Sequence, residues 1–305
     1  MTSSREHPPE GTERARTGPV LAAAAAELSA AGVGSPRPDA EWLATYVLGV
    51  ERSRLPLVAG FTPDELARYR RLVARRAGRE PLQHLLGSAA FRHLELAVGP
   101  GVFVPRPETE LLAEWGIAQA RRVVAERPGT APVVVDLCSG SGAIALSVAY
   151  ELPAATVYAV ERSARALDWL RRNAADRAAA GDPPIRVVAA DVTDPGLLAE
   201  LTGRVDVLLC NPPYVPAGTD VPPEVADHDP ADAVFGGTDG LAVIRPVVHR
   251  AAELLAPGGV VGIEHDDTHP VAVPALFTAD GRYADVTGHP DLAGRPRFST
   301  ARRAS

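Results

Sequence analysis

Hydrophobic and polar positions alternate in two different ways along the chain, and the change divides it into a helical part and a mixed part. Between residues 19 and 88, apolar residues recur at helical spacing in segments such as PDAEWLATYVLGV and TPDELARYRRLVARRAGRE. The second segment begins with Thr62 as N-cap and Pro63 at the first helical position, followed by acidic residues, as helix N-termini favour. Residues 19–88 are therefore predicted to form a small all-helical domain.

From residue 132 the pattern changes to short apolar runs that alternate with helical stretches. The runs are PVVVDLCSG, ATVYAVE, IRVVAAD, VDVLLCN and GGVVGIEH, and they are rich in β-branched residues. Strands that alternate with helices predict a parallel sheet covered on both faces. The later segments YADVTGH and PRFSTARR are predicted to form a closing pair of strands.

The remaining segments set the domain boundaries. Residues 89–110 alternate apolar positions with Gly and Pro, which predicts a hairpin and linker leading into a helix over residues 108–122. Residues 1–18 are polar and proline-rich, and are predicted to be a disordered tail. The α/β domain is expected to cover residues 111–305.

Composition excludes several classes of protein. Hydrophobic residues make up 46% and charged residues 23% of the chain, which is typical of a globular protein. No apolar run approaches the ~20 residues of a membrane span, and the N-terminus lacks the apolar core of a signal peptide. Cys138 and Cys210 are too few for a disulfide framework, which favours a cytoplasmic location, and neither has the spacing of a metal ligand.

The net charge of −7 bears on the partner. Proteins that bind nucleic acid usually carry a basic surface, because phosphate contacts supply much of the affinity. Arginines gather in RYRRLVARRAGR, residues 68–79, but they alternate with apolar residues and are interpreted as a solvated helix face. No direct nucleic-acid substrate and no membrane partner are expected.

A glycine-rich turn follows the first run of the α/β domain. It reads DLCSGSG, residues 136–142, and opens a helix whose N-terminus presents backbone amides to a ligand. Glu161 ends the second run, where a carboxylate can accept both hydroxyls of a ribose. Asp191 ends the third run, beside the expected position of an adenine. Since the carboxyl ends of parallel strands meet at one edge of the sheet, these residues predict a nucleotide-type site there.

Two cofactors fit a glycine turn followed by a ribose-binding acid. A dinucleotide requires room and donors for a pyrophosphate, usually supplied by G-x-G-x-x-G, but Gly142 is followed by Ala143, Ile144 and Ala145. S-adenosylmethionine has no phosphate, and its amino-acid end requires turning backbone and carboxylates such as Asp136. The D-x-x-x-G-x-G pattern therefore favours the methyl donor.

The fourth run ends in Asn211-Pro-Pro-Tyr214, which suits methylation of a planar nitrogen. Such a nitrogen is a poor nucleophile because its lone pair is delocalised. The side-chain oxygen of Asn211 and the carbonyl of Pro212 can accept hydrogen bonds from both N–H groups and stabilise the developing positive charge. The prolines fix φ, and Tyr214 offers a ring on which the planar group can stack. We call this arrangement the amide clamp.

The chain resembles the release-factor glutamine methyltransferases over nearly its whole length after the tail. The segments that carry the resemblance are EPLQHLLGSAAF, GVFVPRPETELL, DLCSGSGAIAL, NPPYVP, FGGTDGLAVIR and LLAPGGVVGIEH. The resemblance implies a Rossmann-like, seven-stranded class I methyltransferase fold with an N-terminal helical domain that embraces the substrate. It also implies S-adenosylmethionine as donor, and methylation of the glutamine in the Gly-Gly-Gln loop of class I peptide-chain release factors.

The resemblance also assigns the site residues. The implied donor-binding residues are Cys138, Ser139, Gly140, Ser141, Gly142, Glu161, Asp191, Val192 and Asn211. The implied catalytic residues are Asn211, Pro212 and Tyr214, and Asn211, Pro212, Pro213 and Tyr214 are expected to hold the substrate. A segment expected to close over the donor includes Phe103, Arg106 and Thr109.

The sequence departs from the family pattern at several positions, and two other functions compete. Cys138, Ser139 and Ser141 replace the usual glycine and threonines, Val192 stands where an aromatic residue is common, Asp229 replaces a glutamate, and EHDDTH lacks a glycine. NPPY is shared with enzymes that methylate the amino group of adenine in DNA or RNA, which is the first alternative. A non-catalytic module that only senses the cofactor is the second.

Overall fold

The computed structural model describes residues 14–305, which form two compact units, residues 14–86 and residues 87–305. The predicted tail over residues 1–18 lies mostly outside the described residues. Its last part belongs to the first unit, because Ala15 pairs with Phe61 through backbone hydrogen bonds of 2.9 and 2.8 Å and the first helix begins at Thr17. The first unit therefore begins earlier than the predicted residue 19.

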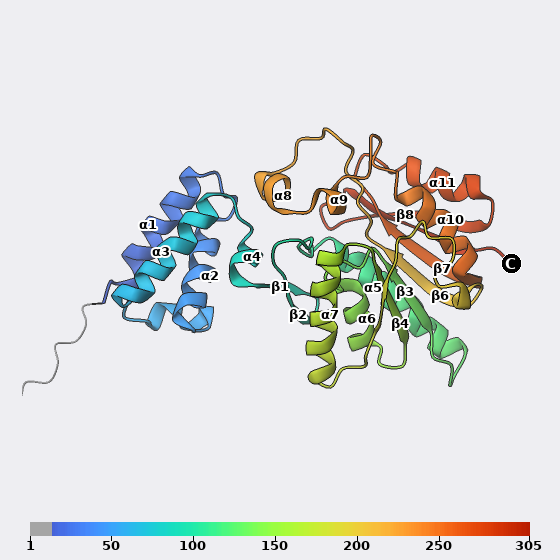
Figure 1. Cartoon of the computed structure of the whole chain (residues 1–305), viewed down its shortest axis with the longest axis horizontal. Helices are drawn as coiled ribbons and strands as arrows, with labels where there is room; N and C mark the ends of the chain where they lie inside the picture. The colour runs from blue at the N-terminus through green and yellow to red at the C-terminus, as the bar shows by residue number, and fades with distance from the viewer. Residues whose placement is uncertain (1–13) are drawn as a thin grey trace, which may run out of the picture. The chain divides into compact units, whose positions relative to one another are not determined.

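The first unit is helical, as predicted (Figure 1). Its elements are α1 (Thr17–Ala30), α2 (Pro36–Leu48), the 3-10 helix η1 (Arg52–Leu57), α3 (Pro63–Ala77) and α4 (Leu82–Leu86). Thr62 and Glu65 form a capping box at the start of α3, which satisfies two of the amides that every helix N-terminus leaves unpaired. Leu28, Leu43 and Phe61 are among the residues of its apolar core.

The arginine-rich face of α3 is only partly solvated. Arg68, Arg70, Arg71 and Arg75 are exposed, as interpreted from the sequence. Arg76 instead lies inside the unit and donates a 2.7 Å hydrogen bond to Asp39 of α2. A buried guanidinium requires such a carboxylate, so the assignment of a fully solvated face is wrong at Arg76.

The second unit is built on a seven-stranded sheet in the order β5-β4-β3-β6-β7-β9-β8. Its strands are β3 (Val133–Leu137), β4 (Thr156–Glu161), β5 (Arg186–Ala189), β6 (Val205–Cys210), β7 (Leu255–Glu264), β8 (Tyr283–Pro290) and β9 (Pro296–Arg303). The first five run parallel, and the closing pair β8 and β9 is antiparallel. All seven predicted strands are present, and the predicted fold class is confirmed.

Helices cover both faces of the sheet (Figure 1). One face packs against α5 (Thr109–Glu126), α6 (Ala143–Glu151) and α7 (Ala164–Ala179), and the other against α10 (Ile244–Leu254) and α11 (Ala272–Asp280). Along β3, Val134 enters the core on the α5–α7 face while Val135 enters the core on the α10–α11 face. Both faces of the central strands are therefore buried, which explains their continuous apolar runs.

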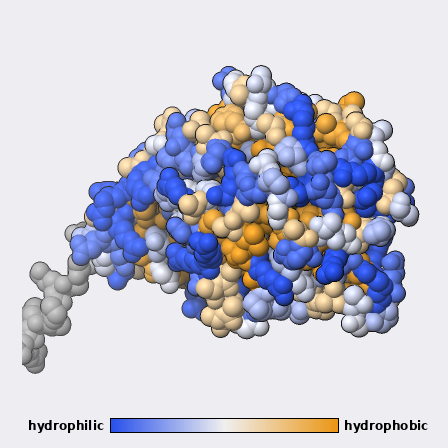
Figure 2. All heavy atoms as spheres, turned by 45° about the vertical axis from the view of Figure 1, so that its right-hand side comes forward, coloured by the Kyte–Doolittle hydropathy of each residue, from blue (hydrophilic) through white to orange (hydrophobic). Residues whose placement is uncertain are grey.

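Smaller elements complete the second unit. They are the hairpin β1 (Ser88–Phe91) and β2 (Leu94–Ala97), the 3-10 helix η2 (Ala199–Leu201), and the short helices α8 (Pro223–His228) and α9 (Ala231–Val234). Within residues 14–305, every helix is too short or too polar to span a lipid bilayer. Figure 2 shows hydrophilic residues interspersed with smaller hydrophobic areas on the face it presents.

Candidate active site

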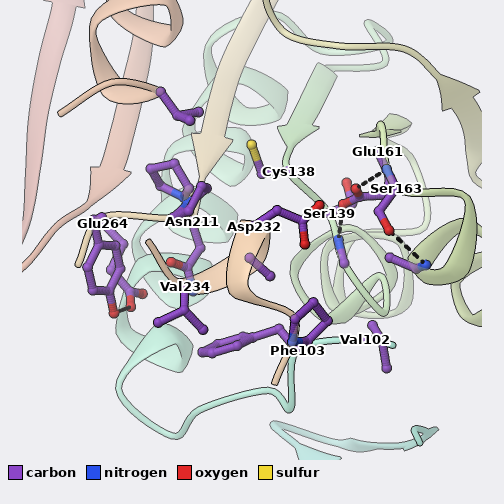
Figure 3. Close-up of a pocket in the computed structure, with 18 of the residues that line it drawn as sticks. Val102, Phe103, Cys138, Ser139, Glu161, Ser163, Asn211, Asp232, Val234 and Glu264 are labelled. Atoms are coloured by element: carbon purple, nitrogen blue, oxygen red, sulfur yellow. Dashed lines mark hydrogen bonds between the residues drawn. The ribbon is translucent and has the colours of Figure 1, made fainter. Parts of the chain in front are cut away.

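A cavity of about 590 Å³ lies in the second unit, at the carboxyl ends of the parallel strands. The turns after β3, β4, β5 and β6 form one part of its wall, residues 101–109 and 221–246 form another, and Phe91, Glu264 and Arg297 complete it. Nearly all the residues assigned from the sequence line it: Cys138, Ser139, Gly140, Ser141, Glu161, Asp191, Val192, Asn211, Pro212, Pro213 and Tyr214, together with Phe103, Arg106 and Thr109. Figure 3 shows Glu161 and Ser139 on one side of this cavity and Asn211 and Glu264 on the other.

Gly142 belongs to the turn but does not line the cavity. It caps α6 with φ at +89°, and a Cβ at this position would lie 2.6 Å from Cδ1 of Leu170. The absence of a side chain therefore lets the turn pack against α7. Gly140, which does line the cavity, also has a positive φ of +55°, and so does Cys138 at +59°.

Asp136 does not face the cavity, contrary to the expectation that it meets the amino-acid end of the donor. The residue is 1% exposed, and its Oδ2 accepts a 3.2 Å hydrogen bond from the backbone N–H of Ala145 in the first turn of α6. Burial raises the pKa of the Asp136 carboxyl to about 7. Its role is to cap the helix that follows the turn, where unpaired amides favour an acidic partner.

The Glu161 carboxylate is fixed by three backbone amides. Its Oε2 accepts from Gly140 at 2.9 Å, and its Oε1 accepts from Arg162 and Ser163, each at 2.8 Å. An ionised carboxylate has about four good acceptor positions, so the structure leaves about one, on Oε2, instead of the two expected for a pair of ribose hydroxyls. The orientation of Glu161 is therefore set before any ligand arrives.

Asp191 and Val192 lie beyond the end of β5, on the same wall. Asp191 accepts hydrogen bonds from the amide and hydroxyl of Thr193 and from Arg162, and the amide of Thr193 is the largest cause that lowers the pKa of Asp191. Val192 is 7% exposed and provides an apolar surface. The ion pair between Arg162 and Asp191 was not anticipated from the sequence.

Asn211 and Pro212 present two acceptor oxygens. Nδ2 of Asn211 donates a 3.0 Å hydrogen bond to the hydroxyl of Thr109 at the start of α5. Within residues 14–305, neither Oδ1 of Asn211 nor the carbonyl of Pro212 has a hydrogen-bond partner. Both oxygens are therefore available to a ligand.

Tyr214 is joined to an acid that the sequence-based assignment missed. Its hydroxyl donates a 2.9 Å hydrogen bond to Oε1 of Glu264 at the end of β7. Glu264 is 1% exposed and lines the cavity, and burial raises the pKa of its carboxyl to about 7. Glu264 could have been identified from the sequence as the acid at the end of the GGVVGIEH run. Because β7 lies beside β6 in the sheet, this acid lies near the residues that follow β6.

The arginines that line the cavity are each paired with an aspartate, which disfavours a ligand that carries phosphate. They are Arg106, Arg162 and Arg297, which form ion pairs with Asp229, Asp191 and Asp291. A pyrophosphate requires cations or amide donors that are free to neutralise it. The cavity therefore suits a ligand without phosphate better than a dinucleotide.

Similarity to curated proteins over nearly the full length of the chain decides the family. A protein of Mycolicibacterium smegmatis named release factor glutamine methyltransferase is 54% identical over 283 residues, covering 93% of this chain and 96% of that protein. A protein of Streptomyces coelicolor with the same name is 50% identical over 288 residues, covering 93% of this chain and 97% of that protein. The chain belongs to the release factor glutamine methyltransferase family.

Two family models and another curated methyltransferase also match the chain. Residues 20–87 match the family described as PrmC N-terminal domain, and residues 121–228 match the methyltransferase small domain. A protein of Streptomyces pristinaespiralis named 4-amino-L-phenylalanine/4-methylamino-L-phenylalanine methyltransferase is 40% identical over 271 residues, covering 88% of this chain and 89% of that protein. This chain is thus an enzyme that transfers methyl groups, as the sequence predicted.

The cavity of this family member fits a methyl donor of the S-adenosylmethionine type. Its volume lies within the range of about 300–1,000 Å³ typical of cofactor sites. The residues that would hold the donor are Glu161, Asp191, Val192 and the backbone around Gly140. Residues 14–305 contain no cluster of three or more His, Cys, Asp or Glu side chains placed to hold a metal ion.

Proposed function

We propose that this chain transfers a methyl group from S-adenosylmethionine to the side-chain amide nitrogen of the glutamine in the Gly-Gly-Gln loop of class I peptide-chain release factors. The donor, when bound, supplies a methyl group on a positively charged sulfur. The chain's own residues must then orient the acceptor nitrogen. The names of the relatives support this acceptor over the amino group of adenine.

The observation that carries the proposal is the pair of unpaired oxygens at the end of β6. Asn211 and Pro212, which carry these oxygens, line the same cavity as Glu161. A primary carboxamide has two N–H groups, and two fixed acceptors hold it in one orientation. Positive charge develops on the nitrogen during transfer, and the same oxygens stabilise it. The nitrogen, once methylated, loses its extra proton to water, so no strong general base is required.

The neighbouring residues support the geometry of the amide clamp. Pro212 and Pro213 are buried and restrict the backbone, so the acceptor carbonyl is held in place before substrate arrives. Tyr214 lines the cavity, and its hydroxyl is held by Glu264. This anchor leaves the ring as a fixed surface on which the carboxamide can stack.

The helical unit is assigned to recognition of the protein substrate. It includes residues 20–87, which match the PrmC N-terminal domain. Its surface carries the exposed arginines of α3 and the half-exposed aromatic residues Trp42 and Tyr46. We place the activity in the cytoplasm, where release factors act.

Mass spectrometry of a purified class I release factor tests this function. After incubation with enzyme and S-adenosylmethionine, peptides that contain the Gly-Gly-Gln loop should gain one methyl group on the glutamine. Single-stranded DNA, RNA and 4-aminophenylalanine serve as competing acceptors. Methyl transfer to one of these, with an unmodified release factor, would overturn the proposal.

A further inference from the structure

The turn that joins β8 to β9 holds an apolar side chain in solvent. Leu292 in this turn is 95% exposed, and the residues that follow it, up to Arg295, are exposed as well. A single exposed leucine is common on protein surfaces and has no meaning by itself. It becomes informative where the backbone is built to hold it in one place and that place adjoins a functional site.

Asp291 holds this turn in one conformation. Its Oδ1 accepts hydrogen bonds from the backbone N–H of Ala293 at 2.9 Å and of Arg295 at 3.0 Å. Its own backbone N–H donates to the carbonyl of Arg295 at 2.7 Å, and its carbonyl accepts from Gly294 at 2.9 Å. Leu292 is therefore presented from a rigid support, so that a partner which packs against it has little backbone to order.

The turn lies beside the catalytic cavity. Oδ2 of Asp291 accepts a 3.1 Å hydrogen bond from Nη2 of Arg297, and Arg297 lines the cavity. Phe298, the next residue, is the partner of Glu264 where β9 pairs with β7, and Glu264 also lines the cavity. A single side chain, that of Arg297, thus joins the turn to the wall of the cavity. The turn is therefore on the same edge of the sheet as the amide clamp.

The chemistry of the turn suits an extended protein segment. Leu292 offers apolar surface, and the exposed Arg295 has no ion pair within residues 14–305, so its guanidinium can donate to main-chain carbonyls. Neither residue lines the cavity. A small acceptor makes its contacts inside the cavity, whereas a glutamine that belongs to a protein brings flanking main chain to the surface outside it. The turn is in position to meet that flanking chain.

We propose that residues 291–295, which we call the docking turn, bind the protein substrate beside the glutamine that is methylated: Leu292 packs against the flanking segment, and Arg295 donates to its main-chain carbonyls. This inference rests on the proposed function, because it takes the acceptor glutamine to belong to a loop of a release factor. The docking turn contributes to binding of the substrate and not to the methyl transfer itself.

Substitution of Leu292 tests the docking turn. In methylation of the release factor, we expect KM to rise about 10-fold in Leu292→Ala, the loss typical of an apolar side chain that is buried when a partner binds. Leu292→Met keeps the apolar surface and should stay within about threefold of wild type. Both kcat and the donor Kd should be unchanged, because the turn lies outside the cavity.

Val271→Ala is the matched control. Val271 is 77% exposed just before α11 and does not line the cavity, so its substitution also removes apolar surface from the second unit. We expect kcat, KM for the release factor and the donor Kd to stay at their wild-type values. Direct titration of the release factor into each variant should show the same order of affinities as KM.

A double variant tests whether the rigid support matters. Asp291→Ala removes the acceptor that fixes the turn and should raise KM for the release factor as Leu292→Ala does. Because both act through the same contact, the double variant should lose no more than about threefold beyond Leu292→Ala alone. Thermal unfolding checks that each variant is folded, and the two Leu292 variants are sufficient if Asp291→Ala is not.

Several results would overturn the docking turn. They are wild-type KM in Leu292→Ala, an equal rise of KM in Val271→Ala, and a loss confined to kcat. Sedimentation adds one more: a wild-type dimer that Leu292→Ala converts to monomer would assign the turn to a second copy of the chain. A release factor left unmethylated by the wild-type enzyme would instead overturn the proposed function.

Discussion

Arg106 donates a 2.6 Å hydrogen bond to Asp229, which lies 123 residues later in the chain. The side chain of Asp229 is fully buried and that of Arg106 is one-third exposed. Arg106 also lies 4.8 Å from the centre of the Phe103 ring. The segment before α5 and the segment before α9, which both line the cavity, are thus joined by one ion pair.

Arg106→Ala should weaken donor binding about tenfold, because it leaves the Asp229 carboxylate buried without a cation and releases one wall of the cavity. Burial already raises the pKa of Asp229, and Arg106 opposes that shift. Isothermal titration with S-adenosylmethionine measures the change. Arg245→Ala removes a comparable but exposed pair with Asp239 and should leave donor affinity unchanged. Wild-type affinity in Arg106→Ala would show that the pair does not shape the site.

Glu161→Gln should raise the donor Kd about 30-fold or more, because an amide nitrogen cannot accept from the backbone N–H groups that now meet both carboxylate oxygens. Glu126→Gln, at an exposed position at the end of α5, is the control and should leave the donor Kd unchanged. Titration calorimetry compares the two variants with wild type. Equal donor affinity in all three proteins would contradict the assignment of Glu161.

Gly142→Ala should destabilise the second unit by about 3 kcal/mol, from the cost of a positive φ and of a Cβ placed against Leu170. Gly129 also has a positive φ, at +84°, but open space around it, so Gly129→Ala should cost only about 1 kcal/mol. Chemical denaturation measures the free energy of unfolding of each. Equal losses would mean that packing against Leu170 is not what requires a glycine.

The hydrogen bond from Tyr214 to Glu264 predicts that kcat rises with pH through about 7, the pKa to which burial raises Glu264. The charged groups that face this carboxyl are Arg297 on β9, which lowers the pKa, and Glu108 before α5, which raises it. The ionised carboxylate holds the Tyr214 hydroxyl more strongly than the neutral acid does, so activity is higher above this pKa than below it. Glu264→Gln should remove the inflection from the pH profile.

Asp136 supplies the control for this profile, because burial raises its pKa to about 7 as well but it lies outside the cavity. Asp136→Asn should keep the inflection in kcat. Titration of Asp136 affects stability instead. Because its pKa is raised from 3.8 in the folded protein, its contribution to the free energy of unfolding is fully present below about pH 4 and is lost as pH rises through about 7. An inflection that disappears in Asp136→Asn and persists in Glu264→Gln would show that Asp136, and not Glu264, is the group whose titration controls kcat.

The sequence was sufficient for the sheet and for most of the cavity wall. Apolar runs separated by helical stretches identify parallel strands, and the carboxyl ends of such strands meet at one edge. Glu161 and Asn211 could therefore be placed together although they lie far apart in the chain. Helix α11 was missed, because Ala272–Asp280 contains a proline and little helical periodicity.

The errors concern side-chain direction and long-range pairing. Asp136 lies near a strand end, but its side chain points to the amide of Ala145 and not into the cavity. The bond between Tyr214 and Glu264 depends on β7 lying beside β6, and strand order is not visible in an apolar pattern. The partner of Arg106 could not be found for the same reason. Each of these contacts is fixed by tertiary packing.

Methyl transfer by Asn211→Ala tests the central claim most directly. With donor and release factor saturating, we expect turnover to fall at least about 1,000-fold, because the substrate nitrogen loses one of its two fixed acceptors. Donor Kd, measured on the same protein, should stay within about threefold of wild type. Turnover equal to that of wild type would show that Asn211 does not present the carboxamide, and the account of this site would be wrong.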